Sequence, residues 1–150
     1  MFLIDDVNRG IAEAIKTKDR TRLGTLRLLK TALTNRQIEK GRALDDAEAL
    51  QVVSSQIKQR RDSIDQFTQA GRHDLVEKER AELALLESYL PPAADADEVR
   101  RIVDAAIAET GANSPKDLGR VMKAAMARLA GRGVDGKAVN ELVRSRLSGR

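Results

Sequence analysis

Apolar residues recur every three or four positions along nearly the whole chain, and this helical period constrains the fold more than any other feature. The alternating apolar and polar runs that are typical of β-strands are missing. Proline, which interrupts helices, occurs only three times in 150 residues, and two of these form the pair Pro91-Pro92. With 41% hydrophobic residues the chain has enough apolar material for a core, so the sequence predicts an all-α protein.

Capping residues and glycines divide the first part of the chain into four predicted helices. Asp19 is a typical helix N-cap, Gly41 suits a helix end, and Asp45 with Glu48 fits a capping box. The predicted helices cover residues 3–17, 19–41, 45–70 and 73–89. The apolar stripe of the first helix is expected to consist of Ile4, Val7, Ile11 and Ile15. Antiparallel packing around a turn at Gly71 predicts a long-helix hairpin or bundle.

An arginine interrupts the apolar seam of the third predicted helix. Apolar residues step by three and four from Leu50 to Phe67, in a coiled-coil-like pattern that only Arg60 violates. A buried arginine is unfavourable unless a carboxylate pairs with it. We interpret Arg60 as structural and paired with a neighbouring helix, with a snorkelling surface side chain as the alternative.

A proline-containing linker divides the chain into two domains. The segment Pro91-Pro92-Ala93-Ala94 cannot continue a helix, so we expect an N-terminal helical domain over residues 1–92 and a small C-terminal domain over residues 93–150. Three short helices are expected in the second domain, with starts at Asp95 and Glu98 (a second capping box), at Ser114-Pro115 and at Asp135. Fewer than 60 residues make a thin core, so this domain is expected to lean on the first domain or on a partner.

Several kinds of chemistry are excluded by what the chain lacks. It has no cysteine, which excludes disulfides and thiolate sites, and its one histidine, His73, is interpreted as a cap or surface residue. No phosphate-binding Gly-Lys-Ser/Thr loop and no catalytic constellation is found, so we expect no catalytic residue, metal or cofactor. No apolar run approaches the ~20 residues of a membrane span, and no secretory signal is visible. The expected location is therefore the cytoplasm, with no membrane partner.

Positive charge is concentrated in two parts of the chain. Residues 116–150 hold nine Lys and Arg against three Asp and Glu, and residues 20–42 hold seven against one. Such clusters raise the local concentration of polyanions, although a solvated helix face is the alternative for each. In the C-terminal cluster, the spacing of Arg120, Lys123 and Arg128 spreads them over part of one helix face.

A glycine-rich segment lies within the C-terminal cluster. Gly131, Gly133 and Gly136 surround Arg132 just before the last predicted helix, and Lys137 follows. Glycine permits close approach of another backbone, helix starts favour anions, and the two cations suit phosphate oxygens. The segment therefore indicates phosphate binding, with a tight interhelical turn as the alternative.

The chain resembles the GatB/YqeY family in the order and spacing of its segments, from about Leu3 to Leu147. The segments that carry the resemblance are Lys58-Gln59-Arg60-Arg61-Asp62-Ser63-Ile64, Phe67, Ala70-Gly71-Arg72-His73-Asp74-Leu75, Glu87-Ser88-Tyr89-Leu90-Pro91, Asp117-Leu118-Gly119-Arg120-Val121-Met122, Gly131-Arg132, Asp135-Gly136-Lys137 and Val139-Asn140. The resemblance is to a stand-alone YqeY-like protein.

This resemblance implies an all-helical N-terminal domain followed by a small helical C-terminal domain. It also implies kinship with the GatB tail of the glutamine-dependent aspartyl/glutamyl-tRNA amidotransferase, a tail that helps to hold tRNA while catalysis takes place elsewhere. Such families are described as carbon–nitrogen ligases with glutamine as amide donor. The chain has no room for the kinase-like catalytic domain, so that activity is expected of the relative rather than of this chain.

Three functions follow as hypotheses. The first is a non-catalytic module that binds tRNA or another folded RNA, and the expected RNA-binding residues are Arg120, Lys123, Arg128, Gly131, Arg132, Lys137 and Asn140. The alternative is a protein–protein adaptor that meets an amidotransferase or synthetase component through its helical hairpin. The third is a true amidotransferase component, for which the sequence offers no catalytic residues.

Overall fold

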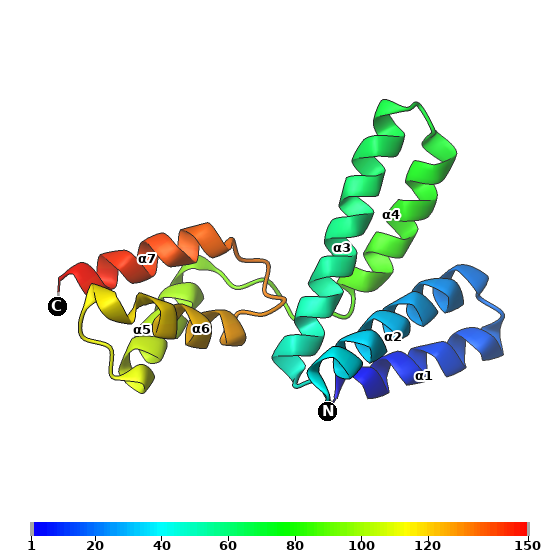
Figure 1. Cartoon of the computed structure of the whole chain (residues 1–150). Coiled ribbons are helices and arrows are strands. Elements are labelled where there is room, and N and C mark those ends of the chain that lie inside the picture. The colour runs from blue at the N-terminus through cyan, green and yellow to red at the C-terminus, as the bar shows by residue number, and fades with distance from the viewer. Residues whose placement is uncertain (1, 150) are drawn as a thin grey trace. The chain divides into compact units, whose positions relative to one another are not determined.

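The computed structural model describes residues 2–149, which form seven α-helices and one short 3-10 helix and no strand. This confirms the all-α prediction (Figure 1). The chain divides into two compact units, Met1–Leu90 and Pro91–Arg150, called unit 1 and unit 2 below. Each unit has its own hydrophobic core, so each is described by itself.

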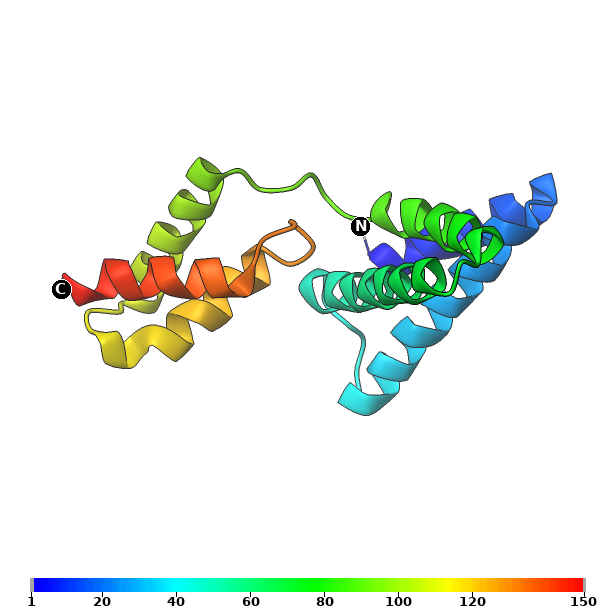
Figure 2. The same ribbon diagram turned by 90° about the horizontal axis from the view of Figure 1, so that it is seen from above.

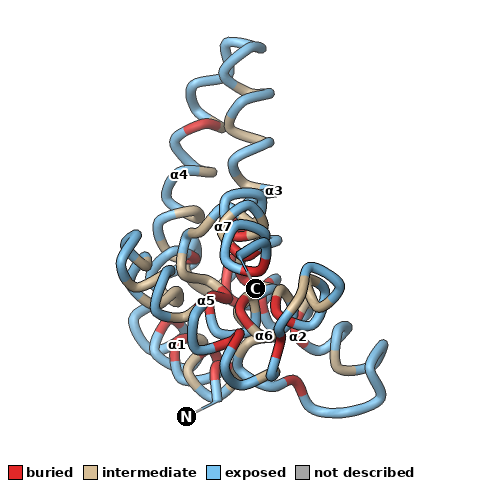
Figure 3. Tube along the Cα trace, turned by 90° about the vertical axis from the view of Figure 1, so that its left-hand side faces the viewer, coloured by how far each residue is buried: buried red, intermediate tan, exposed pale blue. Residues whose placement is uncertain are grey.

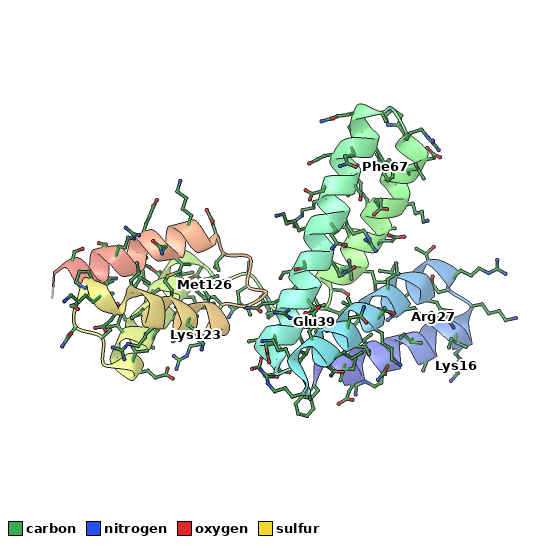
Figure 4. All side chains as sticks on the ribbon, viewed as in Figure 1. Lys16, Arg27, Glu39, Phe67, Lys123 and Met126 are labelled. Atoms are coloured by element: carbon green, nitrogen blue, oxygen red, sulfur yellow. The ribbon has the colours of Figure 1, made fainter. Side chains whose placement is uncertain are left out.

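Unit 1 consists of two antiparallel helical hairpins. Its helices are α1 (Leu3–Thr17), α2 (Arg20–Lys40), α3 (Asp46–Gln69) and α4 (His73–Glu87). Helices α1 and α2 form one hairpin, and the longer pair α3 and α4 forms the other, which is the hairpin around Gly71 that the sequence predicted (Figure 1). The end of the α3–α4 hairpin that carries Phe67 (Figure 4) is largely exposed in Figure 3.

The core of unit 1 buries a different face of α1 from the one predicted. The buried residues of α1 are Leu3, Val7, Gly10 and Ala14, whereas Ile15 is 54% exposed. Ile4 and Ile11 only flank the core. The face shifts because Gly10 lets Leu26 of α2 and Tyr89 come close to the α1 backbone.

Side chains near helix starts satisfy backbone N–H groups as the sequence predicted. The Asp19 carboxylate accepts a hydrogen bond from the Arg22 backbone N–H at 3.1 Å. At the start of α3, Asp45 accepts from the Glu48 N–H at 2.8 Å, and Glu48 accepts from the Asp45 N–H at 3.1 Å. This reciprocal capping box is therefore confirmed.

The Glu48 carboxylate also joins the end of α2 to the start of α3. It pairs with Arg42 at 2.7 Å and with Lys40 at 2.6 Å. Hydrogen bonds from Arg42, from Lys40 and from the Asp45 backbone N–H hold the pKa of the Glu48 carboxyl far below its ordinary value of 4.5. The ionised form of Glu48 thus stabilises the folded state.

We expect this stabilisation to depend on pH with a definite sign. A depressed carboxyl pKa stabilises the fold above the unfolded value and loses this effect as the pH falls below it. The Glu48→Gln variant should therefore melt at a lower temperature than the wild type at pH 7. This difference in melting temperature should shrink progressively below pH 4.5. Thermal melts followed by circular dichroism across this pH range measure the difference. A difference that stays constant down to pH 2 would contradict the stabilising role of ionised Glu48.

Arg60 lies between α3 and α4 as a paired, mostly buried cation. Its Nε atom is 2.9 Å from Glu82 and 3.4 Å from Glu79, and both carboxylates belong to α4. The three side chains are only 12–18% exposed. The structural interpretation of Arg60, as a residue paired with a neighbouring helix, is confirmed.

Unit 2 is a three-helix domain. It contains α5 (Ala96–Thr110), the 3-10 helix η1 (Pro115–Asp117), α6 (Leu118–Arg128) and α7 (Gly136–Ser148), which Figure 2 shows from above. Its core has ten buried residues: Val103, Ala106, Ile107, Ala112, Val121, Ala125, Leu129, Val139, Val143 and Leu147. The domain thus encloses a continuous apolar centre of its own.

Two local predictions in unit 2 were wrong. Asp95 caps α5 by accepting from the Glu98 N–H at 2.8 Å, but the second half of the capping box is absent because the Glu98 carboxylate pairs with Arg132 instead. Ser114 makes no side-chain cap hydrogen bond, and the chain forms η1 before α6 begins. Proline at the first position leads into a 3-10 turn here rather than directly into an α-helix.

Candidate nucleic-acid interface

The loop between α6 and α7 is a tight turn with two glycines in the left-handed region. Gly131 has φ 70° and Gly133 has φ 67°, a conformation that other residues adopt only with strain. Between them, the Arg132 carbonyl accepts a hydrogen bond from the Ala94 N–H at 2.9 Å. A Cβ at Gly133 would lie 3.4 Å from the Cβ of Ala93. The glycines thus bring the loop against the segment that precedes α5.

The Arg132 side chain strengthens the same connection. Its Nε donates to the Pro92 carbonyl, and its Nη2 donates to the Glu98 carboxylate. The side chain is only 21% exposed. Gly131 and Arg132 were predicted to bind RNA, but in the structure they hold the start of unit 2 together, which agrees with the alternative of a tight turn.

Two other predicted RNA-binding arginines are also engaged within unit 2. Arg120 pairs with Asp117 at 2.6 Å and donates to the Thr110 carbonyl at 3.1 Å. Arg128 pairs with Glu109 of α5. Arg120, together with the Asn113 backbone N–H, lowers the pKa of the Asp117 carboxyl. Both guanidinium groups thus have a carboxylate partner within unit 2.

The predicted anion site at the start of α7 is occupied by the protein itself. The Asp135 carboxylate accepts from the Lys137 backbone N–H at 3.0 Å. A carboxylate at a helix N-terminus takes the place that a phosphate would need. We therefore do not assign a phosphate site to these backbone groups.

The two lysines predicted to bind RNA pair with no carboxylate among residues 2–149. Lys123 is exposed on α6 (Figure 4), and Lys137 is exposed at the first turn of α7. Neither ammonium group forms an ion pair with any residue in the described range 2–149. These two lysines therefore keep the unpaired positive charge that the sequence predicted for the whole C-terminal cluster.

Asn140 is half-buried and belongs to a polar stripe along one side of α7. Its Oδ1 accepts from Arg144 Nε at 2.8 Å, and Arg144 makes no ion pair within residues 2–149. Lys137, Asn140 and Arg144 are spaced by three and four residues, so they share one side of the helix. We call them the α7 stripe. The core residues Val139, Val143 and Leu147 occupy the adjoining side of α7.

Arg144 is the member of the α7 stripe that was not predicted as a site residue. The signal was present, since Arg144 follows Asn140 by four positions on a predicted helix. Carboxylates from other helices determine which cations of residues 116–150 remain unpaired. For example, Arg146 pairs with Asp104 of α5 at 3.2 Å, two positions along from Arg144.

The basic stretch of unit 1 is also only partly neutralised. Arg36 pairs with Glu39, and Lys40 and Arg42 pair with Glu48. Arg20 and Arg27 of α2 form no ion pair among the residues that the structure describes. Positive charge on α2 is thus concentrated toward its N-terminal half.

Other kinds of site are not found in the described part of the chain. No group of three or more His, Asp or Glu side chains between residues 2 and 149 is arranged to hold a metal ion. No helix in that range is both long enough and apolar enough to cross a membrane.

The order of segments along this two-unit helical chain matches one known family. The family model described as Yqey-like protein matches residues 4–147. This chain belongs to the YqeY-like family. The family resemblance seen in the sequence is therefore confirmed over nearly the whole YqeY-like chain, across both units.

Three similar curated proteins share the name "Altered inheritance of mitochondria protein 41, mitochondrial". The YqeY-like chain is 34% identical to the Eremothecium gossypii protein over 106 residues, which are 69% of this chain and 58% of that protein. It is 29% identical to the Pyrenophora tritici-repentis protein over 135 residues, or 89% of this chain and 74% of that protein. The Saccharomyces cerevisiae protein (strain YJM789) is 31% identical over 108 residues, which are 67% of this chain and 58% of that protein. The chain thus spans less than two thirds of the first and third of these relatives.

These names correct the expected location. All three relatives are named as mitochondrial proteins, so the prediction of a cytoplasmic protein was wrong. The prediction rested on the lack of a long apolar run and of a visible secretory signal, and such absences do not distinguish one aqueous compartment from another.

Proposed function

We propose that this YqeY-like protein is a non-catalytic accessory module that holds tRNA for glutamine-dependent tRNA amidation. The reaction class is that of a carbon–nitrogen ligase with glutamine as amide donor, with bond making assigned to another chain. The resemblance of the chain to the GatB tail of the amidotransferase supports this proposal. The observation that carries it is the α7 stripe, whose two cations have no carboxylate partner within residues 2–149.

The chemistry of the α7 stripe suits a folded RNA. Such RNA is recognised through its shape, its phosphates and its 2′-hydroxyls, so the low aromatic content of 2% is no obstacle. Lys137 and Arg144 supply charged donors for phosphate oxygens, and Asn140 supplies an amide N–H₂ for a phosphate or a 2′-hydroxyl. The stripe itself contains two cations and no carboxylate, and the exposed carboxylates of Asp135 and Glu141 lie beside it. The stripe therefore has a net positive charge.

We expect the double variant Lys137→Gln/Arg144→Gln to bind unfractionated tRNA at least tenfold more weakly, because each cation neutralises one phosphate. The slope of log affinity against log salt concentration should fall by about 1.4–1.8. Filter binding of the full chain at several salt concentrations measures both quantities.

The matched control removes two cations from elsewhere. Lys30 and Lys58 are exposed on unit 1 and form no ion pair among the described residues, so Lys30→Gln/Lys58→Gln lowers the net charge equally. This control should keep the wild-type salt slope. Equal losses in both double variants, or a wild-type chain that binds no tRNA at low salt, would contradict the proposal.

The adaptor function stays as the second candidate. A groove between α2 and α4 favours it, because this groove combines an exposed apolar side chain with unpaired cations. An intrinsic amidotransferase activity has no comparable support, and reconstitution of tRNA amidation with and without the chain tests it.

A further inference from the structure

A groove of about 550 Å³ runs between α2 and α4 in unit 1. We call it the α2–α4 groove. Its lining includes Arg20, Gly24, Arg27 and Leu28 of α2, and Lys78 and Glu82 of α4. All of these residues belong to unit 1, and Arg27 is marked in Figure 4. The groove takes no part in the tRNA contact proposed above.

One part of the lining is apolar and open. Leu28 is 55% exposed, although most leucines of α2 are buried in the core. Gly24 lies one turn earlier, and no atom lies within 4 Å of the place where its Cβ would be. The bare helix backbone at Gly24 therefore allows another helix to approach closely beside an exposed leucine.

Three of the four charged side chains that line the groove are cations. Arg20, Arg27 and Lys78 form no ion pair with any residue that the structure describes. The carboxylate that lines the groove, Glu82, already pairs with Arg60 at 2.9 Å. The groove thus presents three unpaired cations, and Glu82, its one carboxylate, shares Arg60 with Glu79.

Two of the three threonines that line the groove, Thr25 and Thr31, are engaged within α2. The Thr25 hydroxyl donates to the Thr21 carbonyl at 3.0 Å, and the Thr31 hydroxyl donates to the Arg27 carbonyl at 3.0 Å. Both hydroxyls are therefore bound to their own helix. Recognition in the groove then falls to the exposed leucine, to the three cations and to the Thr21 hydroxyl.

We propose that the α2–α4 groove docks an acidic amphipathic helix of a partner protein. An apolar centre with a charged rim is the usual anatomy of a protein interface, and a helix in a groove needs apolar anchors at helical spacing. Apolar side chains of the partner pack on Leu28 over Gly24, and its Asp or Glu side chains pair with Arg20, Arg27 and Lys78. An RNA backbone would match the cations but offers no apolar group to cover Leu28, so the protein helix fits better.

Photocrosslinking of the full chain tests this proposal. A benzoylphenylalanine at position 28 is irradiated in the cells that make the protein, and the crosslinked peptide is sequenced by mass spectrometry. We expect a peptide with apolar residues every three or four positions and an excess of Asp and Glu. The same probe at Ile38, which is 72% exposed on α2 but outside the groove, should give no such adduct.

Charge reversal supplies the second arm of the experiment. Arg20→Glu/Arg27→Glu/Lys78→Glu should lower the yield of the position-28 adduct at least tenfold, while circular dichroism shows the wild-type helix content. An adduct with RNA, an adduct with a peptide that is neither acidic nor amphipathic, no adduct, or an adduct that survives charge reversal would overturn the proposal. Because the α7 stripe is unchanged in these variants, tRNA binding is measured separately and either proposal can fail alone.

Discussion

Gly10→Ala is expected to lower the free energy of unfolding of unit 1 by about 1–2 kcal/mol, although alanine is the better helix former. A Cβ at position 10 would lie 2.5 Å from Tyr89 Oη and 2.8 Å from Leu26 Cδ1. Real Cβ atoms do not approach other atoms this closely, so the neighbouring side chains must move. Leu26 is fully buried, which limits its movement. Overpacking of about 1–3 kcal/mol then outweighs the gain of up to about 1 kcal/mol in helix propensity.

Denaturant unfolding followed by circular dichroism measures this effect, and a second glycine supplies the control. Gly24 is in the interior of α2, with no atom within 4 Å of a Cβ position. Gly24→Ala should therefore stabilise the protein by about 0.5–1 kcal/mol. Tyr89→Phe removes the nearest atom, so it should recover part of the stability lost in Gly10→Ala. If both glycine variants change stability in the same direction, the packing argument fails.

Arg60→Ala is expected to destabilise unit 1 by about 3–5 kcal/mol, the largest effect of any single substitution considered. The substitution leaves Glu79 and Glu82 close together, only 18% and 12% exposed, with no cation between them. Arg60 Nε makes no hydrogen bond of good geometry, so the contacts with these carboxylates are ionic. The loss comes from two uncompensated, poorly solvated charges rather than from one hydrogen bond.

A neighbouring ion pair provides the comparison for Arg60. Arg61, the next residue of α3, pairs with Glu87 of α4 at 3.0 Å, but these side chains are 63% and 44% exposed. Water solvates both charges, so Arg61→Ala should cost about 0–1 kcal/mol of stability.

Tyr89 is the only tyrosine in a chain without tryptophan, so its fluorescence reports the unfolding of unit 1. Arg60→Met combined with Glu79→Gln and Glu82→Gln should recover most of the lost stability. A loss for Arg60→Ala no larger than for Arg61→Ala would show that burial does not amplify the interaction.

The arginines of unit 2 show why a count of charges does not define a binding surface. Residues 116–150 contain nine Lys and Arg, but Arg120, Arg128, Arg132 and Arg146 each pair with a carboxylate. Such pairs attract a polyanion far less than isolated cations do, because the two charges cancel at a distance. The α7 stripe remains cationic because no carboxylate from another helix reaches it in the described structure.

Local interactions explain what the sequence determined by itself. The helix bounds follow from caps and glycines only a few residues away, as at Asp19, Gly41 and the Asp45–Glu48 capping box. The helical period likewise indicates which side of α7 faces the core, because side chains three and four positions apart share one face. The all-α class and the family therefore follow from the chain alone.

Tertiary structure decided the contacts between residues that are far apart in the chain. Arg132 pairs with Glu98, 34 positions earlier, and Arg128 with Glu109, 19 positions earlier. The close approach of Tyr89 and Leu26 to the α1 backbone at Gly10 determined which face of α1 is buried. Charge pairing and close packing depend on distances in space, and a helical period does not say which side of a neighbouring helix lies opposite. For that reason the sequence located the cations, whereas only the folded chain determined which of them stay available to a partner.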